Sequence, residues 1–228
     1  MKLVLFDIDG TLLWTDGAGR RAMEGALVEV FGTAGSTDYR YDGKTDRQIA
    51  REQMRASGFD DATIDQRIDD LLDSYVRRLD VELVRDESAR MCSGVPALLD
   101  ALGEHANATL GLLTGNIERG ARRKLDRVGI DFAQFRANAF GCDHENRPEL
   151  PAIAQRRARE NAGLDINGDR VVIIGDTPAD IHCGRSIGVR AIGVATGRYS
   201  VEELSSHSPA AVFATLDDTD AVLDAILG

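Results

Sequence analysis

Short apolar runs alternate with helix-like segments along most of the chain. The runs typical of strands are Leu3–Phe6, Ala108–Leu113, Ala137–Phe140, Val171–Ile174, Ala191–Val194 and Ala211–Phe213. Helical spacing of apolar residues, ending near a glycine, is found at Gly94–His105, Ile117–Gly129, Glu149–Gly163 and Pro178–Gly188. Continuous apolar strands that alternate with helices indicate a buried parallel sheet. We therefore predict an α/β fold, a Rossmann-like parallel sheet with helices on both faces.

The stretch of residues 15–90 interrupts this alternation. It contains no convincing strand, and its helical patterns are Gly19–Phe31, Asp46–Ser57 and Ala62–Val84. We therefore expect a small all-α cap domain over residues 15–90, inserted into a core of residues 1–14 and 91–228. The two connections near Leu13–Thr15 and Ser88–Gly94 are the predicted hinges.

Composition narrows the classes of partner. The 228 residues carry a formal net charge of −11, which argues against nucleic acid or an anionic membrane as the main partner. The sequence contains no run of 18 apolar residues, so we expect no membrane span. The three cysteines are widely spaced without a CxxC pair, as expected of reduced thiols in a cytoplasmic protein. We expect a monomer, with a dimer as the alternative.

Polar residues follow three of the predicted strands. Asp7 and Asp9 follow the first strand, Thr114 follows Leu110–Leu113, and Asp176 with Asp180 follows Val171–Ile174. Ligands bind at the carboxyl ends of strands in such sheets, so these residues should share one site. Clustered carboxylates need a counter-ion, and oxygen ligands suit Mg²⁺. A carboxylate can attack phosphorus, while a threonine at a helix start suits phosphate oxygens.

These motifs resemble the haloacid dehalogenase superfamily of phosphotransferases over essentially the whole chain. The sequence DIDGT at 7–11 is similar to its first motif, Thr114 to its second, and GDTPAD at 175–180 to its fourth. The helical insertion resembles the cap of the phosphoglycolate phosphatase and β-phosphoglucomutase branch. GKTD at 43–46 resembles a substrate-loop signature of that cap.

The resemblance implies a role for each matching residue. Asp7 would be the nucleophile, Asp9 the general acid and base with its carbonyl on Mg²⁺, and Thr114 would bind the phosphoryl group. Asp7, Asp9, Asp176 and Asp180 would form the metal site. The residues expected to bind phosphate or substrate are Gly10, Thr11, Gly115, Asn116, Lys44 and Thr45.

One departure concerns the family's third motif, which supplies a lysine. Arg147 stands in that segment here and is the favoured catalytic cation, although arginine is not equivalent to lysine. Lys124 is the alternative candidate. The rest of the basic cluster Arg119–Lys124 and the acidic stretch Asp60–Asp73 are interpreted as solvated helix faces.

The second carboxylate decides among the family's reactions. Asp9 suits an alkoxide leaving group, which needs a proton, whereas a halide leaving group does not. We therefore predict a Mg²⁺-dependent phosphomonoester hydrolase that forms an aspartyl-phosphate and acts on a small phosphorylated metabolite. The alternatives are a phosphomutase of the β-phosphoglucomutase type and a non-catalytic protein that binds Mg²⁺ and a phospholigand.

Overall fold

The computed structural model describes residues 1–85 and 87–228 and contains a six-stranded sheet in the order β5-β4-β1-β6-β7-β8. Every neighbouring pair in it is parallel. Its strands are β1 (Lys2–Phe6), β4 (Ala108–Thr114), β5 (Ala139–Phe140), β6 (Val171–Gly175), β7 (Arg190–Val194) and β8 (Ala211–Phe213). The predicted parallel α/β sheet is therefore confirmed. Because β1 lies between β4 and β6, the carboxyl ends of these three strands are neighbours.

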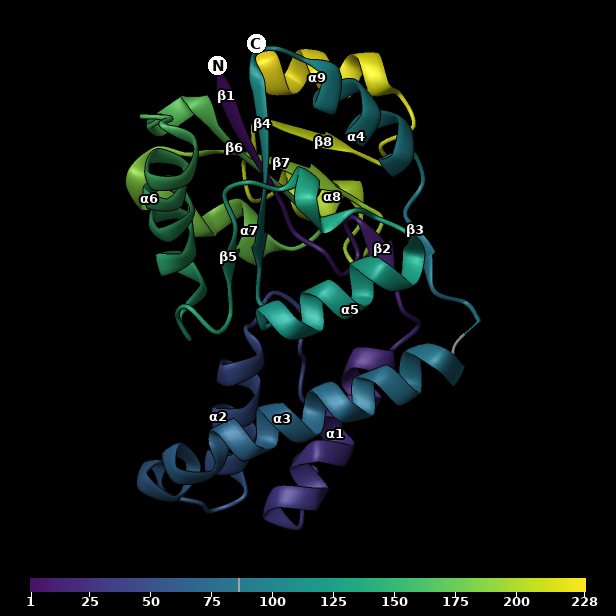
Figure 1. Ribbon diagram of the computed structural model, residues 1–228, viewed down its shortest axis with the longest axis vertical. Helices are drawn as coiled ribbons and strands as arrows, with labels where there is room; N and C mark the ends of the chain where they lie inside the picture. The colour runs from purple at the N-terminus through teal and green to yellow at the C-terminus, as the bar shows by residue number, and fades with distance from the viewer. Residues whose placement is uncertain (86) are drawn as a thin grey trace.

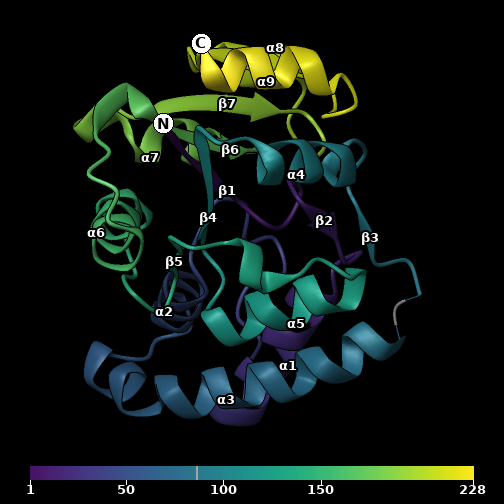
Figure 2. The same cartoon turned by 45° about the horizontal axis from the view of Figure 1, so that its top comes forward.

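Helices cover both faces of this sheet (Figures 1 and 2). On one face α4 (Val95–Glu104), α5 (Glu118–Val128) and α9 (Thr219–Leu227) pack on side chains such as Phe6 and Ile174. On the other face α6 (Leu150–Ala162) and α7 (Pro178–Cys183) enclose Leu5 and Ile173. Successive strand residues point to opposite faces, so covering both faces explains the uninterrupted apolar runs.

Helices α1 (Ala18–Phe31), α2 (Asp46–Ala56) and α3 (Asp61–Arg85) enclose an apolar cluster of their own. In Figure 1 they lie beyond α5, at the opposite end of the molecule from α4 and α9. The two connections to this helical layer pair with each other as a short antiparallel ribbon of β2 (Leu13–Trp14) and β3 (Arg90–Met91). Residue Asp86, within the proposed cap range 15–90, lies outside the described residues. The division into two domains stays a prediction.

Several short elements differ from the sequence-based expectation. The ribbon β2–β3 has two residues in each strand, too few for a periodic signal. The helix expected over Pro178–Gly188 ends at Cys183 because the chain turns at Gly184, where a Cβ would lie 2.6 Å from Val189. Helix α8 (Val201–Ser205) was not predicted, although Ser200 and Glu203 form a capping box that signals its start. Along the chain described, no helix is both long and apolar enough to span a membrane.

Candidate active site

Three strand ends bring the predicted site residues to one edge of the sheet. Asp7 follows β1, Thr114 is the last residue of β4, and Asp176 follows β6. All three side chains are buried, and they line the same cavity of about 440 Å³. The strand order therefore assembles residues that are up to 169 positions apart in the sequence, as the strand-end argument predicts.

Asp7, Asp176 and Asp180 form a buried acidic cluster, with one oxygen from each carboxylate within 4.8 Å of the others. Burial raises the pKa of Asp7 to about 6, against the opposing attraction of Arg147. Burial, together with the charges of Asp180 and Asp7, raises the pKa of Asp176. Gly10 permits this crowding because its φ is +82° and a Cβ there would lie 2.4 Å from Asp176 Oδ2. The cluster therefore carries more negative charge than its surroundings compensate.

Arg147 is the cation beside this cluster. It begins the short 3₁₀ turn Arg147–Glu149, is 4% exposed, and places Nη2 3.2 Å from Asp7 Oδ1. The same nitrogen donates a close hydrogen bond to Asp180 Oδ1. Burial alone would lower the pKa of the guanidinium, but Asp180 and Asp7 raise it. Of the two candidates for the third-motif cation, Arg147 is the one that contacts Asp7.

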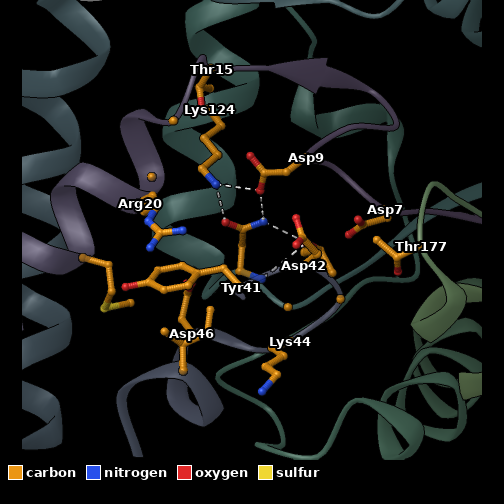
Figure 3. A pocket seen from close by; sticks show the side chains of 18 of the residues that line it. Asp7, Asp9, Thr15, Arg20, Tyr41, Asp42, Lys44, Asp46, Lys124 and Thr177 are labelled. Atoms are coloured by element: carbon orange, nitrogen blue, oxygen red, sulfur yellow. Dashed lines mark hydrogen bonds and ion pairs between the residues drawn. The ribbon is translucent and has the colours of Figure 1, made fainter. Parts of the chain in front are cut away.

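Lys124 instead contacts Asp9, as Figure 3 shows. Its Nζ lies 2.6 Å from Asp9 Oδ2 and 2.7 Å from Asn116 Oδ1. The Asn116 amide nitrogen donates to the same Asp9 oxygen at 2.7 Å and to Thr114 Oγ1 at 2.9 Å. Thr11, in the turn that follows β1, donates a hydrogen bond to Asp176 Oδ1 at 3.3 Å. Asp9, Asn116 and Thr114 are therefore joined in one network.

The loop of residues 43–46 docks on the core without turning its side chains toward Asp7. The Lys44 amine pairs with Glu52 and donates to Tyr39 Oη at 2.8 Å, and in Figure 3 it points away from Asp7 and Asp9. Thr45 caps α2 and donates to the Glu145 carbonyl at 2.7 Å. The two side chains predicted to contact substrate are therefore held by protein groups.

Asp46, which follows in this loop, closes the contact with the core. Its carboxylate accepts a hydrogen bond from the Ile117 N–H at 2.8 Å, and its own N–H donates to the Gly115 carbonyl at 2.8 Å. Ile117 precedes α5 and offers no side-chain cap, so Asp46 supplies it from another part of the chain. Burial raises the pKa of Asp46 to about 6, against the attraction of Lys124.

Apart from the buried Lys124, the charged residues of the basic and acidic helix faces are exposed to solvent, as predicted, and the structure also pairs the two faces with each other. Arg119 and Arg123 of α5 bond Asp73 and Asp80 of α3 at 2.6 and 2.8 Å. Lys124, in the same basic cluster, is buried. Sequence periodicity shows that each face is charged, but only the packing of α3 against α5 brings the opposite charges together.

Sequence reasoning missed several residues around the cavity. Arg20 lies over the Tyr41 ring, with Cζ 4.9 Å from its centroid, and both residues line the cavity. Arg198 follows β7, lines the same cavity and lies 3.4 Å from Asp42. The position of Arg198 after a strand was the one available signal, because the others depend on helix packing.

The donor set fits a divalent cation. Three buried carboxylates face one guanidinium, so two negative charges remain to be balanced. Asp180 is already held by Arg147 and by the Thr177 hydroxyl at 2.6 Å, which leaves Asp7 and Asp176 with oxygens available. Hard oxygen donors in this number are typical of a Mg²⁺ site completed by water and phosphate.

Comparison with known proteins places this geometry in context. The profile of the haloacid dehalogenase-like hydrolase family matches residues 4–194. The N-acetylmuramic acid 6-phosphate phosphatase of Pseudomonas aeruginosa is 29% identical over 215 residues, which cover 91% of this chain and 87% of that protein. A hydrolase from Pseudomonas syringae has a similar structure, with a TM-score of 0.75, 19% identity and 99% of both chains covered. CbbY from Rhodobacter sphaeroides, solved with phosphate, has a TM-score of 0.66, 18% identity and 96% of both chains covered.

Proposed function

This chain belongs to the haloacid dehalogenase-like hydrolase family, and we propose that it hydrolyses a small phosphomonoester through an aspartyl-phosphate on Asp7. The predicted membership is thereby confirmed, while the substrate and the residue roles are proposals. The observation that carries the proposal is the juxtaposition, at the cavity, of Asp7 with Arg147 and the carboxylates of Asp176 and Asp180.

In the first step Asp7 attacks phosphorus and the bond to the leaving alkoxide breaks. The alkoxide takes a proton from Asp9 and departs as the alcohol. In the second step water attacks the phosphorus of the aspartyl-phosphate, and Asp9 takes a proton from that water. The bond to Asp7 breaks, which restores the Asp7 carboxylate and releases inorganic phosphate. Asp9 thus acts first as general acid and then as general base.

The neighbouring groups support both steps through their charge. Arg147 is buried next to Asp7, where a cation stabilises negative charge on the transferring phosphoryl group more strongly than in water. Thr114, the last residue of β4, offers its hydroxyl to the phosphoryl oxygens. Gly10, Thr11, Gly115 and Asn116 shape the turns around this position.

Mg²⁺ would be held by the carboxylates of Asp7 and Asp176 and by the backbone carbonyl of Asp9, with Asp180 orienting Arg147 and the cluster. When bound, the ion neutralises carboxylate charge and draws phosphate oxygens to the site. The raised pKa of Asp7 and Asp176 supports a need for such a cation.

The helical layer α1–α3 would act as a cap that opens for substrate and closes to exclude water. Residues of this layer such as Met23 and Tyr75 line the cavity together with core residues, which supports a shared chamber. The ribbon β2–β3 is the proposed hinge. Binding of a phosphate analogue should then protect residues 13–15 and 88–94 from proteolysis, and unchanged sensitivity would contradict the hinge.

The relative from Pseudomonas aeruginosa is named for a sugar phosphate, which supports a substrate panel led by hexose 6-phosphates. Phosphoglycolate and nucleoside monophosphates belong in the same panel. A cytoplasmic location and a monomeric or dimeric state stay predictions.

The test is hydrolysis of 4-nitrophenyl phosphate and of the panel, with Mg²⁺ or with chelator. We expect turnover that requires Mg²⁺, is lost in Asp7→Asn, and is kept in the control Asp100→Asn, an exposed residue of α4. A wild-type protein that binds Mg²⁺ and phosphate but cleaves none of these esters would contradict the proposal and favour the non-catalytic alternative.

A further inference from the structure

Lys124 is a buried lysine whose contacts are not those of the third-motif cation. Its side chain is 4% exposed, and the amine bonds Asp9 Oδ2 and Asn116 Oδ1. Burying an ammonium group costs several kcal/mol unless it is well paired. The amine of Lys124 is therefore kept buried by its bonds to Asn116 and to Asp9, the proposed general acid.

The hydrogen bonds around Lys124 are directional. An ammonium group has three donors and no acceptor, so it fixes the Asn116 side chain with its oxygen toward Lys124. The Asn116 amide nitrogen is thereby turned toward Asp9 Oδ2 and Thr114 Oγ1. Two donors then converge on one oxygen of Asp9, and this fixes the direction of its carboxyl group.

The packing around Lys124 leaves the amine little freedom. A Cβ on Gly19 of α1 would lie 3.1 Å from Lys124 Nζ, so α1 packs close to the amine and a side chain at this position would crowd it. On the other side α5 carries Lys124 from the core. The general acid is thus held by a residue that is itself clamped between core and helical layer.

We infer that Lys124 is a positioning residue that, with Asn116, aims the Asp9 carboxyl at the leaving-group oxygen. The inference rests on the proposed phosphatase function. Asp9 matters most for an alkoxide leaving group, which must be protonated as it departs, and little for a stable phenolate. Lys124 should therefore affect poor leaving groups selectively.

The experiment compares kcat/KM for benzyl phosphate and 4-nitrophenyl phosphate, two esters of similar shape with poor and good leaving groups. The variants are Lys124→Met, Lys124→Arg, Asp9→Asn and the double variant of Asp9→Asn with Lys124→Met. The control is Arg122→Met, a half-exposed neighbour on α5 that pairs with Glu118. The readout is kcat/KM for benzyl phosphate divided by kcat/KM for 4-nitrophenyl phosphate. Within one preparation this ratio does not depend on how much of the protein is folded.

We expect Lys124→Met to lower kcat/KM for benzyl phosphate by about 100-fold, the lower range of general-acid contributions, and that for 4-nitrophenyl phosphate by less than 10-fold. Lys124→Arg should recover part of the wild-type ratio, and Arg122→Met should keep the wild-type ratio. The double variant should have the same ratio as Asp9→Asn alone. An unchanged or increased ratio in Lys124→Met, or fully additive losses in the double variant, would overturn the inference. Absence of wild-type turnover on both esters would instead overturn the proposed phosphatase function.

Discussion

Replacing Asp46 by asparagine should stabilise the protein at neutral pH. Asp46 is 7% exposed, and its carboxylate caps α5 from the first residue of α2. Asparagine has nearly the same shape and keeps an oxygen that can accept from the Ile117 N–H. The substitution therefore removes the buried charge while it preserves the contact between the helical layer and the core.

The magnitude follows from the pKa of Asp46, which burial raises from 3.8 to about 6 against the attractions of Lys124 and the Ile117 N–H. A shift of about 2 units at 1.36 kcal/mol each corresponds to about 3 kcal/mol. Because the folded-state pKa is raised, the ionised group costs stability as pH rises above 4, and the full cost is present above 6. The advantage of Asp46→Asn should therefore be near zero at pH 4 and about 3 kcal/mol at pH 7.5.

Urea unfolding of wild type and Asp46→Asn between pH 4 and pH 8 measures this difference. The matched control is Asp42→Asn in the loop before α2, where Asp42 pairs near the surface with Arg198 and should lose up to about 1 kcal/mol. A variant that is less stable than wild type at pH 7.5, or an advantage that does not depend on pH, would refute the burial argument.

Three further substitutions test other parts of the site. Arg147→Met should lower kcat/KM for 4-nitrophenyl phosphate by about 100-fold or more because it removes the buried cation at Asp7, and wild-type kinetics would contradict that role. Gly10→Ala should lower the free energy of unfolding in urea by about 1–3 kcal/mol, because the φ of Gly10 is +82°. It should also weaken Mg²⁺ binding in calorimetry, because the added Cβ would press on Asp176. An unchanged Mg²⁺ affinity would show that the turn adapts. Arg119→Ala should cost less than about 1 kcal/mol, because its bond to Asp73 is more than half exposed, and the cost should vanish in 1 M salt; a larger, salt-independent loss would contradict this.

The sheet and its acidic edge were predictable from the sequence because their signals are local. An apolar run long enough for a buried strand reveals β1 without any partner, and Asp7 and Asp9 follow it directly. Parallel strands bring their carboxyl ends to one edge of the sheet, and the position of β1 between β4 and β6 makes these three ends neighbours. The strands β2 and β3 of the separate ribbon escaped prediction because two residues carry no period.

The assignment of each basic residue to its partner was decided by the tertiary structure. Sequence offers Lys44, Lys124 and Arg147 as cations for the site, and it favours Arg147 over Lys124 only because Arg147 stands in the third-motif segment. Packing turns Lys44 toward Glu52, brings Lys124 on α5 to Asp9, and places Arg147 beside Asp7. Long cationic side chains reach several possible partners, so their pairing depends on how distant helices pack, whereas a strand and the acids at its end are fixed by neighbouring residues in the chain.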